Sequence, residues 1–341
     1  MLLLRKPLPK VARAIISAYS GGLYVPNDAN CFQDSAATTA GAKDAVVGYV
    51  RDLIGTNHLT QATAGYKPFL RKGAKNWLLN SAALATQSVT TRAVAYTLHF
   101  TGTGTVTLSG TSTAGPLVGT SASDRVSLTF TPTAGSLTLT VSGTVTNAML
   151  ETGSSVSTYV ETVGSPASNG EGPWWLDFDG SDDRLVFTSI PIQMSDSSFV
   201  VVSARAEKTP GVVFRNGGAT GQRCPQIVVD ASTPRYGWID DAVTSAYIVS
   251  ATNVIGSTKV YAARKAGNTK TGRLDGVVQG TDVQVMGATT LTYAQIGADS
   301  AAGSNPWAGP VYGVALGVGA ITDAELAIVE RYIGSLGGIA L

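Results

Sequence analysis

Apolar and polar residues alternate through the middle of the chain. Apolar side chains occupy every second position in residues 94–100, 126–130 and 137–141. This period of two, with many β-branched residues and breaks at Gly, Pro and Ser, predicts short strands that each bury one face. Residues 101–145 contain 13 threonines and only two charged residues. The pattern therefore predicts a small antiparallel β-sandwich over residues 76–165.

The stretch that follows residue 166 also has the pattern of β-structure, with more aromatic residues. The dipeptide Asp275-Gly276, between two short apolar runs, predicts a two-residue hairpin. The runs with strand character are 174–178, 184–187, 199–205, 211–214, 226–230, 235–239, 246–250, 259–264, 272–274, 277–278 and 312–318. Together with the threonine-rich module, they predict an all-β chain.

The period changes to that of a helix near the C-terminal end. Thr322 and Glu325 form a capping box, in which each side chain satisfies a free backbone amide of the first helical turn. An apolar stripe follows, and Gly334 is the predicted end of this helix. One short helix is therefore expected to close the chain.

A second helical pattern lies near the start. Apolar residues at helical spacing form one stripe ahead of a Gly-Gly break: Leu8, Val11, Ala12, Ile15 and Tyr19. A helix this short is marginal in isolation, so its stripe needs a partner. Two interpretations are open: residues 1–20 are an arm that docks onto other proteins, or they form a first helix packed on its own domain.

Composition limits the function classes. Charged residues make up 14% of the chain and the formal net charge is +1, so bulk electrostatics favours neither nucleic acid nor an anionic membrane as a partner. No apolar run reaches the length of a membrane span. Cys31 and Cys224 lie far apart, without metal-binding spacing, and are expected to be buried free thiols. A surface this poor in charge suits an oligomer or a larger assembly.

Three segments in order carry a family resemblance: "DLIGTNHLTQATAGYKPFL" (52–70), "LDFDGSDDRLVF" (176–187) and "WAGPVYGVALGVGAITDAELAIVERYI" (307–333). Together they resemble the concanavalin A-like lectin/glucanase jelly rolls, including laminin-G-like modules, of bacteriophage virion proteins. The threonine-rich module is similar to carbohydrate-binding-module-like insertions in such proteins. The resemblance implies a discontinuous jelly roll over 21–75 and 166–341, with residues 76–165 inserted.

The resemblance also implies a function. We expect a non-enzymatic structural protein of the phage particle surface, in a tail-associated fibre or adhesion role that contacts a host-surface glycan or receptor. The alternative is a capsid decoration or cement protein without a ligand, and a glycan-degrading enzyme is a distant third. Expected partners are other virion proteins and copies of the same chain. Phage appendages of this kind are commonly trimeric, so a trimer is favoured over a dimer.

Candidate catalytic chemistry is scarce. Hydrolases of this fold carry paired carboxylates in an E-x-D-x-x-E motif, and that spacing does not occur in the sequence. Only two histidines are present, His58 and His99, which leaves little material for a catalytic triad or a zinc site. We therefore expect no enzymatic activity and no catalytic residues.

The densest group of acidic residues is Asp179, Asp182 and Asp183, in "DGSDD". Asp, Gly and Ser are the usual residues of a tight turn, because their side chains bond nearby backbone and Gly tolerates positive φ. A turn between two strands is therefore the favoured interpretation, and no cofactor is expected. Calcium, which prefers carboxylate and carbonyl oxygens, is the alternative ligand of this group.

Glycan binding needs exposed aromatic faces beside hydrogen-bonding side chains. The best local match is "RYGWIDD", which contains Tyr236, Trp238, Asp240 and Asp241. Trp307 in "NPWAG" is a second candidate. For each aromatic residue the alternative is a place in the core.

Overall fold

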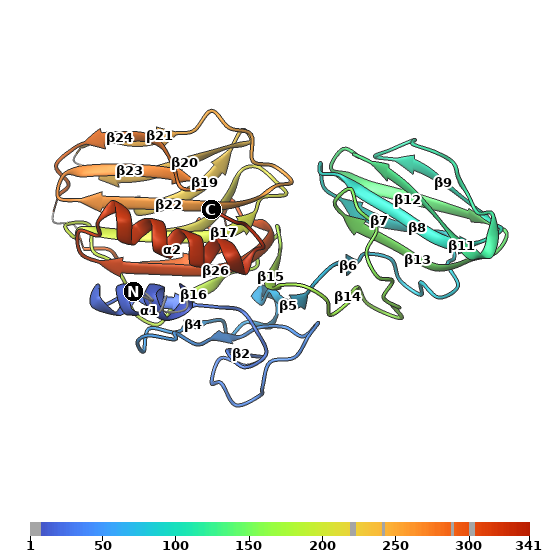
Figure 1. Ribbon diagram of the computed structural model, residues 1–341, viewed down its shortest axis with the longest axis horizontal. Coiled ribbons are helices and arrows are strands. Elements are labelled where there is room, and N and C mark those ends of the chain that lie inside the picture. The colour runs from blue at the N-terminus through green and yellow to red at the C-terminus, as the bar shows by residue number, and fades with distance from the viewer. Residues whose placement is uncertain (1–7, 219–222, 241–242, 288–289, 300–303) are drawn as a thin grey trace, which may run out of the picture. The chain divides into compact units, whose positions relative to one another are not determined.

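The structure is a computed structural model that describes residues 8–218, 223–240, 243–287, 290–299 and 304–341. It is nearly all β, with one helix near each end, which confirms the expected fold class (Figure 1). The chain divides into two compact units, one made of residues 1–70 and 173–341 and the other of residues 71–172. The sequence predicted these boundaries near residues 75 and 166.

The larger unit contains two antiparallel sheets. The first has eight strands in the order β24-β23-β22-β17-β26-β15-β5, with β1 paired to β26. Its members are β1 (Gly22–Tyr24), β5 (Phe69–Lys72), β15 (Trp174–Asp179), β17 (Ser198–Arg205), β22 (Thr258–Ala266), β23 (Thr269–Leu274), β24 (Val277–Val283) and β26 (Ala308–Val318). The predicted hairpin joins β23 to β24, and both Asp275 and Gly276 have positive φ (48° and 77°), as a type I′ turn requires.

The second sheet has nine strands in the order β2-β3-β4-β16-β25-β18-β19-β20-β21. Its members are β2 (Cys31–Phe32), β3 (Tyr49–Val50), β4 (Leu59–Thr60), β16 (Leu185–Phe187), β18 (Gly211–Gly217), β19 (Arg223–Asp230), β20 (Thr233–Asp240), β21 (Val243–Val249) and β25 (Tyr293–Ile296). Side chains from both sheets, such as Val202 and Phe214, form one fully buried cluster. The two sheets therefore pack face to face around a common core.

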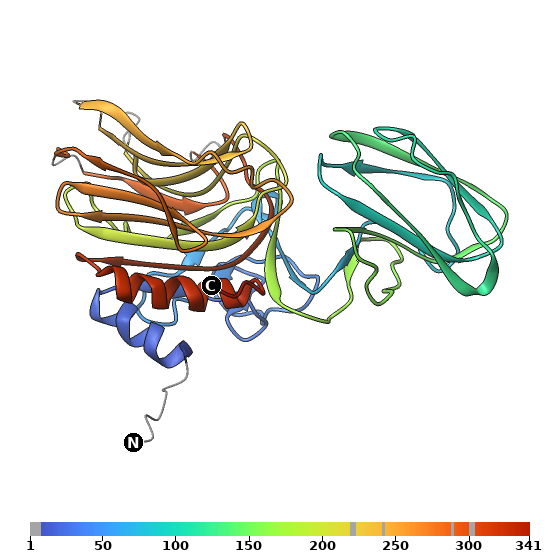
Figure 2. The same cartoon turned by 45° about the horizontal axis from the view of Figure 1, so that its top comes forward.

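Both helices lie on the outer face of the first sheet, side by side (Figures 1 and 2). They are α1 (Leu8–Ala18) and α2 (Asp323–Leu336). The capping box of Thr322 and Glu325 is present at the start of α2. The helix continues past Gly334, the predicted end, and its C-cap is Gly337. Neither helix is long and apolar enough to cross a bilayer, among the residues that the structure describes.

Helix α1 is packed on its own domain, which is the second of the two interpretations of the sequence. Ala12 and Ile16 are fully buried in a cluster with residues of β17, β26 and α2. Leu8, Ile15 and Tyr19 lie partly buried against that cluster, and Val11 is also half-buried. The apolar stripe thus finds its partner within the chain, and the docking-arm interpretation is corrected, because the stripe that was to bind another protein already contacts this one.

The smaller unit is a sandwich of a four-stranded sheet, β10-β9-β12-β7, and a three-stranded sheet, β11-β8-β13. Its strands are β6 (Lys75–Asn76), β7 (Gln87–Thr91), β8 (Tyr96–Gly102), β9 (Thr105–Gly110), β10 (Leu117–Val118), β11 (Ser121–Phe130), β12 (Gly135–Ser142), β13 (Val145–Thr152) and β14 (Ala167–Ser168). The alternating residues Leu98, Phe100 and Leu137 are fully buried, as the period of two predicts. Strands β6 and β14 pair with each other, so the chain enters and leaves this unit at one place.

The packing of α1 gives a testable prediction. Replacing Ile16 by Ala removes a fully buried side chain and is expected to lower the free energy of unfolding by about 2–4 kcal/mol, because the cavity is lined by both helices and the sheet. The matched control Ser17→Ala changes an exposed neighbour and should shift stability by less than about 0.5 kcal/mol. Urea unfolding of the isolated protein measures both. Equal stability of I16A and the wild type would mean that α1 is not docked in the free chain.

Candidate functional site

The acidic group forms the turn between β15 and β16. Oδ1 of Asp179 accepts hydrogen bonds from the backbone amides of Ser181 (2.7 Å) and Asp182 (3.4 Å). Gly180, between Asp179 and Ser181, has a φ of 82°, which favours glycine. The backbone amide of Asp179 in turn donates to Oδ2 of Asp183 at 2.8 Å. The side chains of this segment therefore hold a strand, a turn and a strand, as turn chemistry predicts.

The turn has unusual electrostatics. Carboxylate oxygens of Asp179, Asp182 and Asp183 lie within 4.8 Å of one another, so among the described residues these three form a group that could hold a cation. Burial, followed by the charge of Asp179, raises the pKa of Asp183 to about 7, and Asp177 and Asp182 add smaller contributions. Near neutral pH the group can therefore retain a proton. Three carboxylates supply only part of the six to eight oxygens that calcium takes.

Arg184 lies beside the turn but is engaged elsewhere. Its guanidinium lies 3.8 Å from the centre of the Tyr66 ring and donates to the backbone carbonyl of Asp182 at 3.2 Å. Arg184 is therefore a stacking and turn-closing residue.

The predicted glycan-binding aromatics are in the core. Tyr236 and Trp307 are fully buried, and Trp238 is 1% exposed. The Tyr236 hydroxyl donates to the carbonyl of Arg273, and the Trp307 ring meets that of Tyr261 edge-on, with centroids 6.4 Å apart. Rings enclosed in this way present no face to a sugar, so this prediction is corrected.

The remaining glycan candidates cannot be placed: Asp241 and the side chain of Asp240 lie outside the described residues. A signal for the burial was present in the sequence. Tyr236 and Trp238 are two residues apart on one strand, so they share one face of the sheet, and an inward face is the usual place for two large rings.

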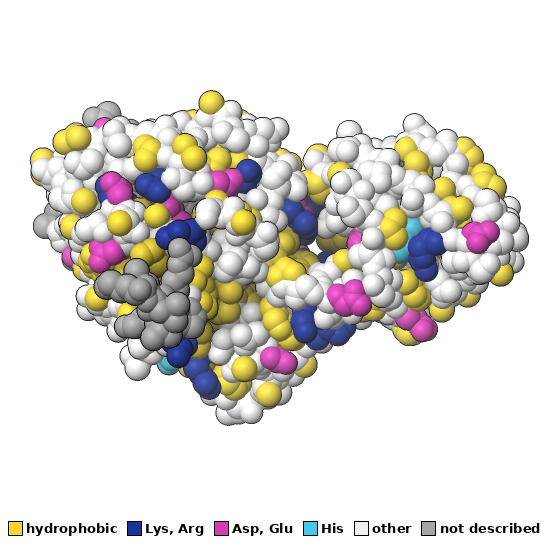
Figure 3. Space-filling model, viewed as in Figure 1, with side chains coloured by type: hydrophobic (Ala, Val, Ile, Leu, Met, Phe, Trp, Pro, Cys, Tyr) yellow, Lys and Arg dark blue, Asp and Glu magenta, His cyan; other side chains and the backbone are white. Residues whose placement is uncertain are grey.

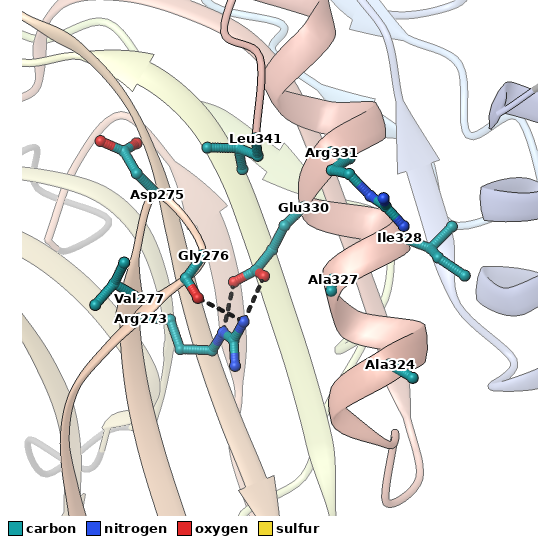
Figure 4. A pocket seen from close by; sticks show the side chains of 10 residues that line it. All are labelled: Arg273, Asp275, Gly276, Val277, Ala324, Ala327, Ile328, Glu330, Arg331 and Leu341. Atoms are coloured by element: carbon teal, nitrogen blue, oxygen red, sulfur yellow. Dashed lines mark hydrogen bonds and ion pairs between the residues drawn. The ribbon is translucent and has the colours of Figure 1, made fainter.

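A groove of about 550 Å³ runs between α2 and the β23–β24 hairpin (Figure 4). Arg273 and Glu330 point toward each other across it and form two hydrogen-bonded contacts of 2.8 and 2.9 Å. Arg273 also donates to the carbonyl of Gly276 at 2.7 Å. Burial raises the pKa of Glu330, and Arg273 opposes that shift. This ion pair attaches the hairpin to the helix, and its charges satisfy each other rather than a ligand.

A second buried polar network lies in the smaller unit. Nε2 of the fully buried His99 lies 3.0 Å from Oε1 of Glu151, and the guanidinium of Arg125 lies 2.5 Å from Nδ1 of the same ring. Because arginine can only donate, Nδ1 accepts and the Nε2 hydrogen points to Glu151. The backbone amide of Ser157 also donates to Glu151, at 2.8 Å. The network links three segments of this unit, and the alternation of the sequence gave no sign of it.

The comparisons with known proteins find only weak similarity, and only to solved structures. No protein-family model matches the chain, and no curated protein matches it. Among solved structures, the binding domain of Paraclostridial Mosquitocidal Protein 1 has 7% identity and a TM-score of 0.38, over 47% of this chain and 43% of that one. The botulinum neurotoxin serotype G binding domain has 8% identity and a TM-score of 0.40, over 49% of this chain and 44% of that one.

A heptameric SAP-like pentraxin from Limulus polyphemus has 16% identity and a TM-score of 0.36, over 46% of this chain and 80% of that one. The chain thus spans less than half of the two toxin binding domains. Because identities and TM-scores are this low, no function is transferred from these proteins to the chain.

The raised pKa of Asp183 predicts a specific pH dependence. Folding raises this pKa from 3.8 to about 7, so between these values the folded state binds more protons than the unfolded state. The contribution of Asp183 to stability therefore falls as pH rises from about 4 to about 7, by at most about 1.4 kcal/mol per pH unit. Asp183→Asn keeps an oxygen that can accept from the Asp179 amide and removes the titration.

Urea unfolding of both proteins across that pH range measures the effect. The stability of D183N relative to the wild type is expected to rise steadily from about pH 4 to about pH 7. The variant Asp124→Asn, at an exposed position of the smaller unit, controls for the general effect of losing a carboxylate. A D183N difference that is constant over the whole range would show that Asp183 titrates normally.

Proposed function

We propose that the chain is a non-enzymatic structural protein of a phage particle, in a tail-associated fibre or adhesion role that contacts a host-surface glycan. The observation that carries the assembly part is an exposed apolar edge on the larger unit. Figure 3 shows apolar side chains along the border where β21 and β24 lie. We call this the valine edge, and its members with their exposed fractions are Val249 (50%), Val277 (63%), Val278 (50%), Val283 (73%) and Val285 (67%).

The valine edge joins the ends of both sheets. Strand β24 is the last strand of the first sheet and β21 the last of the second. A Cβ atom placed on Gly280 of β24 would lie 2.9 Å from Cγ2 of Ile248 in β21, so the two strands are in contact. Ser250 Oγ, directly after β21, donates to Oε1 of Gln279 at 2.7 Å. The edge is therefore one continuous border of the sandwich.

The edge lacks the usual protection against association. Soluble proteins cover an edge strand or place charges, especially lysines, along it, because its free backbone groups and side chains recruit other chains. The one charged residue in β24 is Asp282, and Lys270 lies 3.5 Å from its carboxylate. Exposed valines on a low-charge border suit burial against a neighbouring subunit. Copies of this chain, in a trimer, are the favoured neighbours, with other virion proteins next.

Two alternative functions rank below this proposal. A capsid decoration protein without a ligand is supported by the burial of Tyr236, Trp238 and Trp307, which removes the aromatic glycan surface expected from the sequence. A glycan-degrading enzyme has less support. Glycosidases need two carboxyl groups that flank the bond to be cleaved, and Asp179 and Asp183 are engaged in the hydrogen bonds of their own turn.

The valine edge is tested by charge. The double variant Val277→Lys and Val283→Lys places two lysines at positions that are 63% and 73% exposed, so the fold should be kept while association is blocked. By light scattering we expect the wild type to be an oligomer, with a trimer favoured, and the variant to be a monomer. Circular dichroism checks that the variant is folded.

The matched control is Val163→Lys, at a valine of the smaller unit that is 69% exposed. It adds a similar charge away from the edge and should leave the oligomer intact. The assembly proposal fails if the wild type is a monodisperse monomer, or if the double variant assembles as the wild type does.

A further inference from the structure

A small polar pocket of about 280 Å³ lies in the larger unit and shares no lining residue with the acidic turn, the groove or the valine edge. Three segments far apart in the sequence build most of it, together with Leu316 of β26: residues 20–24 around β1, the loop 52–57 and residues 189–191. Most of its functional groups are oxygen-bearing. The polar side chains that line it are those of Ser20, Tyr24, Asp52, Thr56, Asn57 and Ser189.

Asp52 is the charged group of this pocket. It is 5% exposed, and its Oδ1 accepts from the backbone amides of Leu23 (3.1 Å) and Ile54 (3.0 Å). Within the part of the chain that the structure describes, no group donates to Oδ2 and no cation pairs with the carboxylate. Asp52 lines the pocket, so this oxygen can exchange a water molecule for a ligand hydroxyl. Oδ2 is thus an acceptor available to a ligand.

The loop leaves room directly in front of this oxygen. A Cβ atom placed on Gly55 would lie 3.1 Å from Oδ2 of Asp52. Glycine at this position therefore keeps open the space from which a ligand hydroxyl can reach the carboxylate.

Asn57 supplies a donor on the same wall. Its Oδ1 accepts from the backbone amide of Ser189 at 2.8 Å and from the Thr188 hydroxyl at 3.2 Å. This fixes the orientation of the amide and leaves its Nδ2 group as the donor. The Tyr24 hydroxyl donates to the backbone carbonyl of Asn57 and so helps to hold the same loop. A fixed carboxylate acceptor and a fixed amide donor thus lie in one pocket, with the hydroxyls of Thr56 and Ser189 at its exposed rim.

We propose that this pocket binds one hydroxyl-rich sugar residue, with Asp52 Oδ2 accepting from a sugar hydroxyl and the Asn57 amide donating to another. The volume equals that of about nine waters at about 30 Å³ each, which is far more than a bare cation fills. One free carboxylate oxygen is also too few for calcium, which takes six to eight oxygen ligands. Vicinal hydroxyls, each both a donor and an acceptor, match a paired acceptor and donor.

This inference rests on the proposed function, because it supplies the glycan-binding part of the adhesion role. The assembly part is measured separately at the valine edge. A protein that assembles but binds no sugar would therefore refute the pocket and leave the assembly proposal standing.

The test uses the full chain and methyl glycosides of glucose, galactose, mannose and N-acetylglucosamine. Saturation-transfer NMR detects binding, and titration gives the Kd, which we expect in the millimolar range, typical of a single small ligand with few contacts. Asp52→Asn can keep an oxygen toward the Leu23 and Ile54 amides while it replaces the free acceptor by a donor. The variant should weaken binding of the preferred glycoside at least about tenfold, the loss expected for one hydrogen bond to a charged group.

Gly55→Ala tests the same point by filling the space in front of Oδ2, and it should also weaken binding at least about tenfold. Its matched control is Gly65→Ala, because a Cβ there meets nothing within 4 Å, and this variant should bind as the wild type does. Thermal unfolding verifies that each variant is folded. The proposal is overturned if none of the four glycosides binds, if D52N and G55A bind as the wild type does, or if CaCl2 alone binds in their place.

Discussion

The contact between the two large sheets is the constraint on which the rest of the larger unit depends. Every second residue of their central strands points into one shared core, and large rings such as Trp238, Trp307 and Phe214 fill it. These rings are consequently unavailable to a ligand. Because the interior is apolar, the polar groups that could bind a ligand lie outside it. They are found in the acidic turn, in the groove beside α2 and in the Asp52 pocket.

With only 14% charged residues, the buried charges are mostly paired. Arg273 with Glu330 and Arg215 with Asp299 are buried ion pairs that connect separate elements, and the acidic turn reduces its repulsion by the raised pKa of Asp183. Buried ion pairs of this kind fix geometry more than they add stability. Asp52 differs from them, because one of its carboxylate oxygens faces a pocket and not a partner. That contrast is why the pocket, rather than the more conspicuous acidic turn, is the place where a ligand is expected.

Local pattern predicted the fold well and the site poorly. Alternation of apolar and polar residues predicted the long strands. The Asp275-Gly276 pair predicted the β23–β24 hairpin, and the capping box predicted the start of α2. Each of these features depends on residues that are neighbours in the sequence. Strands of two residues such as β2, β3 and β4 carry no periodicity and were missed. The predicted helix stripe includes Ala12, which is fully buried, but omits Ile16, which is also fully buried, since α1 packs into the corner between α2 and the sheet. The pocket needs three distant segments, and only tertiary structure brings them together.

We propose that this chain works as a subunit of a particle, with one border for neighbours and one pocket for a ligand. A reconstruction of the intact particle that carries the chain tests this most directly. The account predicts density for the subunit in which the edge formed by β21 and β24 is covered by an adjacent protein chain, while the Asp52 pocket remains open to solvent. A subunit whose β21–β24 edge faces solvent, or a pocket buried against a neighbour, would contradict it.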